Sequence, residues 1–146
     1  MLAARKSREK GFSLVEMIVV VAVLGILLAI VVPALMSAVN RSRQRRSMAD
    51  MHALAQANGM AQVDSSRYVN ALADLQPAYM NPVVTLDAWG NSYVYTISGN
   101  QRNYTLTSNG RDGAAGPGPP VPWFNEPFEP DIILTDGEFT QMPASQ

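Results

Sequence analysis

Hydrophobic residues are concentrated near the start of the chain, in a run that reads MIVVVAVLGILLAIVVPALM from Met17 to Met36. These twenty residues include no charged side chain. A helix rises about 1.5 Å per residue, so a run of this length matches the hydrocarbon core of a bilayer, which is about 30 Å thick. A cleaved secretory signal has a shorter apolar stretch, of about 7 to 15 residues. The pattern therefore predicts a helix that can span a membrane.

The pattern changes after this run but stays helical. Residues 37–62 contain no proline, and positions at spacings of three and four are compatible with one buried face: Met48, Met51, Leu54, Ala55 and Asn58. We expect one continuous helix of about 50 residues, about 75 Å long. Its second half is amphipathic, so we expect that half to lie against a sheet. His52 is interpreted as an ordinary helix position.

The rest of the chain alternates between turn signals and short apolar segments. Tyr68, Leu72 and Leu75 predict a short helix that ends before Pro77. The segments YVYTIS and NYTLTS, separated by Gly99-Asn100, predict two antiparallel strands joined by a tight hairpin, with Trp89 and the tyrosines as core or sheet-face residues. A further short strand is expected over residues 131–134, followed by a turn at Asp136-Gly137. The predicted fold is α+β, a long N-terminal helix packed on an antiparallel sheet of three to four strands.

Composition excludes several functional classes. The 146 residues leave room for one small globular domain, and a net charge of −1 does not favour nucleic acid as a partner. The chain has no cysteine, which removes disulfides and thiol nucleophiles. Its single histidine has no serine or carboxylate at catalytic spacing. We therefore expect a protein that is not an enzyme.

Charges flank the apolar run on both sides. Basic residues precede it, and Arg41, Arg43, Arg45 and Arg46 follow it, so counting positive charges leaves its orientation undecided. The later arginines are either solvated or meet acids on another subunit. Glu16 stands just inside the run, where a carboxylate is costly unless it is paired or near the interface. It is either a functional residue or a first-turn acid favoured by the helix dipole.

The segment Lys10-Gly11-Phe12-Ser13-Leu14-Val15-Glu16, followed by an apolar helix, resembles the processing site of type IV pilins and type II secretion pseudopilins. The resemblance implies that a prepilin peptidase cuts between Gly11 and Phe12 and methylates the amino group of Phe12. It implies that the Glu16 carboxylate pairs with the freed amino group of a neighbouring subunit. It also places the basic leader in the cytoplasm and the head outside the inner membrane.

The resemblance divides the chain into four parts: a leader (1–11), a transmembrane and filament-core helix (12–39), an amphipathic stalk helix (40–62) and a globular head with a Pro-rich loop (63–146). Gly25 and Pro33 interrupt the apolar segment and weaken the helix locally. Family members bend or melt near such a proline during assembly. We expect the same of this helix.

The string D-x-W-G-x-x-Y-x-Y from Asp87, with the glycines and aspartate up to Gly113, resembles the head of the type II secretion major pseudopilin. In that subfamily the following loop binds calcium, and Asp112 is the matching position. This chain then departs from the pattern, with prolines where acids are usual. Glu126, Glu129, Asp131 and Asp136 are candidate replacements, and we expect Asp112 and Asp131 to be metal ligands if calcium binds.

The leading hypothesis is a structural subunit of a type II secretion pseudopilus that helps to drive protein export across the outer membrane. It implies a single-pass inner-membrane protein with a periplasmic head, later assembled into a periplasmic or extracellular filament. The implied partners are copies of itself, minor pilins or pseudopilins, the prepilin peptidase and the inner-membrane assembly platform. The alternatives are a major or minor type IV pilin of a surface pilus, serving adhesion, motility or DNA uptake, and a membrane-tethered binding module.

Overall fold

A computed structural model describes residues 11–116 and 131–142 of the chain. The chain divides into two compact units, Met1–Ala38 and Val39–Gln146. We call them the N-terminal unit and the head unit and describe each by itself. The leader residues before Gly11 and the Pro-rich loop predicted after Gly116, with Glu126 and Glu129, lie outside the described residues.

One helix, α1, extends over Leu14–Ser65, a length of 52 residues, which confirms the predicted long helix. Gly25 and Pro33 both lie within it, and the Ser37 hydroxyl donates to the Pro33 carbonyl at 3.2 Å. Local melting at these two positions stays a prediction about assembly. The helix ends where Ser66 adopts a left-handed backbone conformation with φ of 60°.

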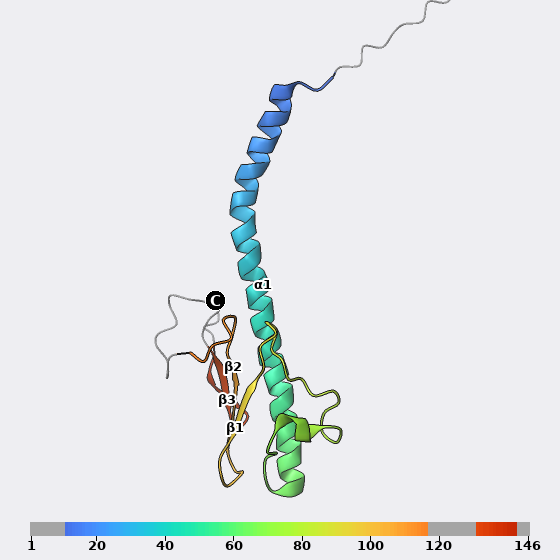
Figure 1. The fold of residues 1–146 in the computed structure, drawn as a ribbon, viewed down its shortest axis with the longest axis vertical. Coiled ribbons are helices and arrows are strands. Elements are labelled where there is room, and N and C mark those ends of the chain that lie inside the picture. Colours follow the sequence, from blue (N-terminus) through green and yellow to red (C-terminus); the bar gives the residue numbers. More distant parts are fainter. Residues whose placement is uncertain (1–10, 117–130, 143–146) are drawn as a thin grey trace, which may run out of the picture. The chain divides into compact units, whose positions relative to one another are not determined.

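The head unit contains a four-stranded antiparallel sheet in the order β1-β2-β3-β4. Figure 1 labels β1, β2 and β3 of this sheet. Its strands are β1 (Val94–Ile97), β2 (Tyr104–Ser108), β3 (Ile132–Thr135) and β4 (Glu138–Gln141). Tyr95 pairs with Leu106, and Leu106 pairs in turn with Leu134. The predicted α+β fold is therefore confirmed, with four strands. A register shift between Ile133 and Leu134 makes the pairing of β3 with β4 irregular.

The connections differ from the prediction in detail. The Ser98 amide still donates to the Asn103 carbonyl, so the β1–β2 turn consists of residues 99–102 and is wider than a tight two-residue hairpin. Gln101, with φ of 55°, supplies the left-handed residue. By contrast, Asp136 and Gly137 form the predicted turn, with φ of 52° and 90°. The short helix before Pro77 is η1 (Leu72–Leu75), a single turn of 3₁₀ helix.

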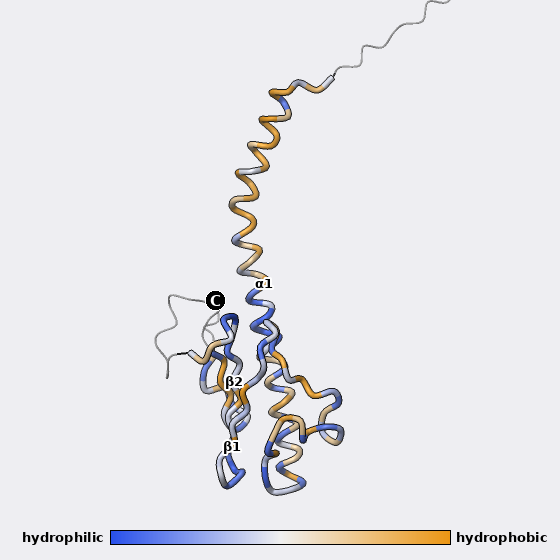
Figure 2. Tube along the Cα trace, viewed as in Figure 1, coloured by the Kyte–Doolittle hydropathy of each residue, from blue (hydrophilic) through white to orange (hydrophobic). Residues whose placement is uncertain are grey.

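The core of the head unit lies between the second part of α1 and the sheet. Met51 and Leu54 of the helix are fully buried with Leu106 and Leu134 of the sheet and with Leu75 of η1. This confirms that the amphipathic face predicted for α1 packs on the sheet. In Figure 2 hydrophobic and hydrophilic residues alternate along this part of α1, as expected for a helix with one buried face.

Candidate processing, assembly and metal sites

The chain enters α1 through three exposed residues, Gly11, Phe12 and Ser13, that are not helical. The Ser13 carbonyl accepts hydrogen bonds from the amides of Glu16 at 3.1 Å and Met17 at 3.3 Å, and these bonds begin the helix. Phe12 is 78% exposed. The peptide bond between Gly11 and Phe12 therefore lies in accessible, non-helical chain, the form in which a peptidase can bind it. Cleavage there stays a prediction.

Glu16 lies in the first turn of α1 and is exposed. Negative charge is favoured at this end of a helix because the first amide groups point outward without partners. Within the described residues the chain offers no basic group that pairs with Glu16. The predicted partner, the amino group of Phe12 on another copy, does not conflict with this arrangement.

The N-terminal unit displays its hydrophobic residues instead of burying them. Every large apolar side chain from Leu14 to Met36 is exposed, and α1 is long and apolar enough to cross a membrane. In Figure 2 almost all of this part of the helix has the colour of hydrophobic residues. Burying apolar area releases about 25 cal/mol per Å². These exposed side chains are therefore stabilised by apolar surroundings that the described residues of the N-terminal unit do not supply.

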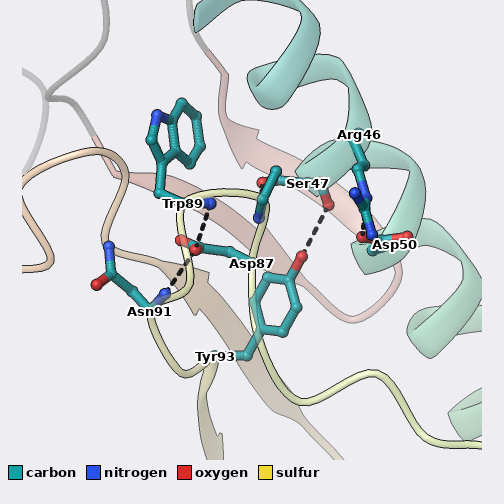
Figure 3. Close-up of polar contacts among 8 residues, drawn as sticks. Arg46, Ser47, Asp50, Asp87, Trp89, Asn91 and Tyr93 are labelled. Atoms are coloured by element: carbon teal, nitrogen blue, oxygen red, sulfur yellow. Dashed lines mark hydrogen bonds and ion pairs between the residues drawn. The ribbon is translucent and has the colours of Figure 1, made fainter.

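Asp87, the first residue of the string that resembles the pseudopilin head, organises the loop before β1. Its Oδ1 accepts the amides of Trp89 at 3.0 Å and Asn91 at 2.8 Å (Figure 3), and its Oδ2 accepts the Ser108 hydroxyl at 2.8 Å. The residue is buried. One carboxylate thus closes the loop on itself and fixes it to the end of β2. Charge-assisted hydrogen bonds of this kind are stronger than neutral ones.

Ser47 attaches the same loop to α1. It is fully buried on the helix face that meets the head. Its hydroxyl accepts the Ala88 amide at 3.1 Å, and its carbonyl accepts the Tyr93 hydroxyl at 3.3 Å, as Figure 3 shows for the tyrosine. The loop and the helix are therefore joined by polar contacts between residues more than forty positions apart.

Asn58 is a second polar anchor on the buried face of α1. Its Oδ1 accepts the Val69 amide at 3.2 Å, and its Nδ2 donates to the Tyr95 hydroxyl at 3.1 Å. Tyr95 in turn donates to the Val69 carbonyl at 2.8 Å. This closed set of bonds holds the segment after α1 against β1. The spacing of residues in the sequence predicted that Asn58 lies on the buried face of α1. A polar side chain on an apolar face needs hydrogen-bond partners, but only the structure identifies them as Val69 and Tyr95.

The loop after β2 brings Asp112 and Asp131 near each other. The Gly116 amide donates to Asp131 Oδ2 at 2.8 Å, and the Ala114 amide donates to Asp112 Oδ1 at 3.2 Å. Burial raises the pKa of Asp131; the Gly116 hydrogen bond opposes that rise, and the charge of Asp112 adds to it. Two carboxylates in one loop, one of them buried, concentrate negative charge there.

Two oxygen atoms near this loop have no partner among the described residues. They are Oδ1 of Asp131 and Oδ1 of Asn109, both buried. Buried oxygens are normally hydrogen-bonded, and hard cations such as Ca²⁺ bind such oxygens. The donor set therefore fits calcium in kind. In the described ranges, however, no three His, Cys, Asp or Glu side chains gather as a metal-ligand group.

Asp136, the remaining described candidate, belongs elsewhere. It follows the end of β3, whereas Asp131 precedes its start, so a strand length separates them. Its carboxylate accepts the Asn103 side-chain amide at 2.8 Å and the Tyr104 backbone amide at 2.9 Å. Asp136 thus closes the β2–β3 end of the sheet and does not join Asp112.

A helix with an exposed apolar N-terminal part, joined to a small α+β head, defines a pilin-like protein. The prokaryotic N-terminal methylation motif matches residues 6–32, which include the predicted cleavage site. The family described as type II secretion system (T2SS), protein G, matches residues 34–119, more than half of the chain. The chain belongs to the type II secretion system protein G family.

Individual relatives agree with this assignment. The type II secretion system core protein G of Aeromonas hydrophila is 33% identical over 128 residues, covering 77% of this chain and 90% of the relative. Those of Pseudomonas aeruginosa and Vibrio cholerae are each 30% identical, covering 77% and 76% of this chain and 90% and 88% of the relatives. No solved structure matches the chain significantly.

Proposed function

We propose that this chain is a structural subunit of a type II secretion pseudopilus, which assembles through its N-terminal unit and takes part in protein export. The observation that carries the proposal is the exposed apolar part of α1, directly preceded by an accessible Gly11–Phe12 bond. Membership of the protein G family favours the pseudopilus over a surface pilus and over a tethered binding module. No catalysis is assigned to the subunit.

The proposed assembly begins in the inner membrane, with the head in the periplasm. A prepilin peptidase removes residues 1–11 and methylates the amino group of Phe12. That amino group then pairs with Glu16 of a neighbouring copy, so two charges that are costly in an apolar core offset each other. Minor pseudopilins and the inner-membrane assembly platform are the further partners of this scheme. Gly25 and Pro33 are where we expect α1 to loosen.

The direct test is the intact mass and N-terminal sequence of the membrane-purified chain, expressed with and without a prepilin peptidase. We expect a chain that begins with N-methylated Phe12 only when the peptidase is present. A Gly11→Val variant serves as the matched uncleavable control. An uncut chain beginning at Met1 in the presence of active peptidase would instead favour a tethered module.

We also propose that the loop after β2 binds calcium through Asp112 and Asp131. Support comes from the buried Asp131 Oδ1, which has no partner among the described residues, and from the charge of Asp112 nearby. Calcium should raise the melting temperature of the head by several degrees, and Asp112→Ala should abolish most of that rise. Asp74→Ala, an exposed acid on η1, is the control. A wild-type melting temperature that is indifferent to calcium would refute this site but not the pseudopilin function.

A further inference from the structure

Positive charge after the leader is concentrated in one short segment. Seven arginines follow Gly11, lysine is absent there, and four of the seven are Arg41, Arg43, Arg45 and Arg46. We call these four residues the arginine collar. From Ser47 onward, three arginines stand against ten acidic residues, a net charge of −7. The collar is thus a strongly basic segment at the start of an otherwise acidic head unit.

The collar is not used for internal ion pairing. All four arginines are exposed, whereas the flanking residues Asn40 and Ser47 are buried. The described residues hold one ion pair, from Arg46 Nε to Asp50 at 3.8 Å, and the Arg46 side chain remains 77% exposed. Because exposed i,i+4 pairs contribute only about 0.5 kcal/mol or less, this contact leaves the charge of the collar available.

The helical arrangement of the collar distinguishes between kinds of partner. At 3.6 residues per turn the four arginines spread over an arc of about 200° of the helix surface. This arc is the side that the buried residues Asn40 and Ser47 do not occupy. A single packed partner contacts a stripe of about 100°. The collar is basic over the whole side of the helix that is not buried. It therefore suits a layer of anions that surrounds the helix better than it suits contact with the surface of a single partner protein.

The position of the collar along the chain indicates which anions these are. Arg41 follows Met36, the last residue of the apolar run, by only five residues of α1. Five helical residues correspond to about 8 Å, which is within reach of the headgroup layer that flanks a hydrocarbon core of about 30 Å. Chain connectivity alone therefore keeps the collar beside phosphate groups whenever the apolar run spans a bilayer.

We infer that the arginine collar binds the phosphates of anionic phospholipids at the outer face of the membrane while the subunit is unassembled. Guanidinium groups match phosphate oxygens in a two-pronged geometry that lysine does not reproduce. The remaining head is acidic and is repelled by the same surface, so the collar is the point of contact. The inference rests on the proposed function, because it requires membrane insertion. A subunit that enters the filament must exchange these lipids for other surroundings.

The test measures lipid selectivity of the full processed chain in phosphatidylcholine vesicles. Trace spin-labelled phosphatidylglycerol and phosphatidylcholine report how strongly each lipid associates with the protein. Wild type should prefer phosphatidylglycerol, and the preference should weaken in high salt because the charges are screened. Replacing the four collar arginines by glutamine should remove the preference for phosphatidylglycerol. Each arginine lost should lower the association of phosphatidylglycerol, relative to phosphatidylcholine, by up to roughly fivefold. The matched control changes Arg67, Arg102 and Arg111 to glutamine and should keep the preference.

The outcomes separate the possibilities. A variant with four lysines in the collar should keep part of the preference for phosphatidylglycerol, and the glutamine variant should keep the wild-type melting temperature. Together these results would attribute the lost preference to the lost charge and not to misfolding. An inserted wild-type chain without preference for phosphatidylglycerol would overturn the inference and leave the pseudopilin function intact. Unchanged lipid preference in the glutamine variant, with loss of cross-links between copies, would also overturn it and identify the collar as a subunit contact. A chain extracted by alkaline carbonate would refute membrane insertion itself.

Discussion

The N-terminal unit and the head unit use hydrophobic residues in opposite ways. From Leu14 to Met36 the large apolar side chains are all exposed, whereas in the head unit Met51, Leu54, Leu106 and others form a closed core. Both parts contribute to the same helix, α1. The first part therefore depends on a membrane or on other copies, and the second part depends on its own sheet. Substitutions in the two parts should affect different properties of the protein.

The largest difference between the two units is expected for Glu16→Ala, which should affect filament formation but not the stability of the head. Without the carboxylate, the amino group of Phe12 on the next copy has no partner, so filaments should be lost or form very slowly. Membrane insertion and the melting temperature of the head should not change. Electron microscopy of sheared filaments and carbonate extraction measure the two effects, with Val19→Ala as the control. Normal filaments from Glu16→Ala would contradict the proposed pairing.

The reverse effect is expected for Leu106→Ala. This side chain is 0% exposed in the centre of the sheet, and its truncation should destabilise the head by about 2–5 kcal/mol. Leu24→Ala removes the same atoms from a residue that is 51% exposed in the N-terminal unit and should leave head unfolding unchanged. Urea unfolding followed by near-ultraviolet circular dichroism compares them. Equal losses would show that the two units do not unfold separately.

A smaller effect within the head is expected for Asp87→Asn. The amide keeps the shape of the side chain but loses its charge and one acceptor oxygen, so the bonds from Trp89, Asn91 and Ser108 cannot all remain. The loss should be about 1–3 kcal/mol. Asp74→Asn, with one bond to the Ala71 amide at an exposed position, should lose less. Equivalent losses in the two variants would refute the role assigned to Asp87.

The mildest expected effect concerns pH. Burial raises the pKa of Tyr104, and the neighbouring Tyr68, Tyr95 and Asp136 raise it further. The unfolded chain loses this proton near pH 10, whereas the folded chain keeps it to higher pH. The contribution of Tyr104 to the free energy of unfolding is therefore intact below about pH 10 and falls above it by at most about 1.4 kcal/mol per pH unit. Melting curves from pH 8 to 11 should decline less steeply for Tyr104→Phe. Parallel curves would argue against this titration.

Local patterns in the sequence predicted most of the fold. The apolar run and the spacing of Met51, Leu54 and Asn58 are local signals, and α1 follows them. Alternation predicted β1 and β2, and Asp136-Gly137 predicted the turn into β4. No local pattern predicts β4 as a strand, because Phe139 is the only large apolar residue among its four. Its strand form depends on pairing with β3 and therefore on tertiary structure.

The site was predicted less evenly. Gly11, Phe12, Glu16 and Asp112 were identified through resemblance. The polar contacts of Asp87 with Ser108 and of Ser47 with Ala88 join positions 21 and 41 residues apart, which no local pattern reports. Asp131 was predicted as a ligand beside Asp112, and the structure adds that its Oδ1 is buried and that Asp136 lies beyond the other end of β3. Long-range polar contacts therefore had to come from the structure.

The irregular pairing of β3 with β4 has a consequence for a protein whose heads come together in an assembly. The proposed assembly would bring many identical heads together, and an open sheet edge is a template for uncontrolled strand addition and fibre formation. The β4 edge is only four residues long, is paired through a register shift, and carries exposed Glu138 and Thr140. Short, irregular and charged edges resist such addition. The β4 edge is therefore a poor template for strand addition between heads.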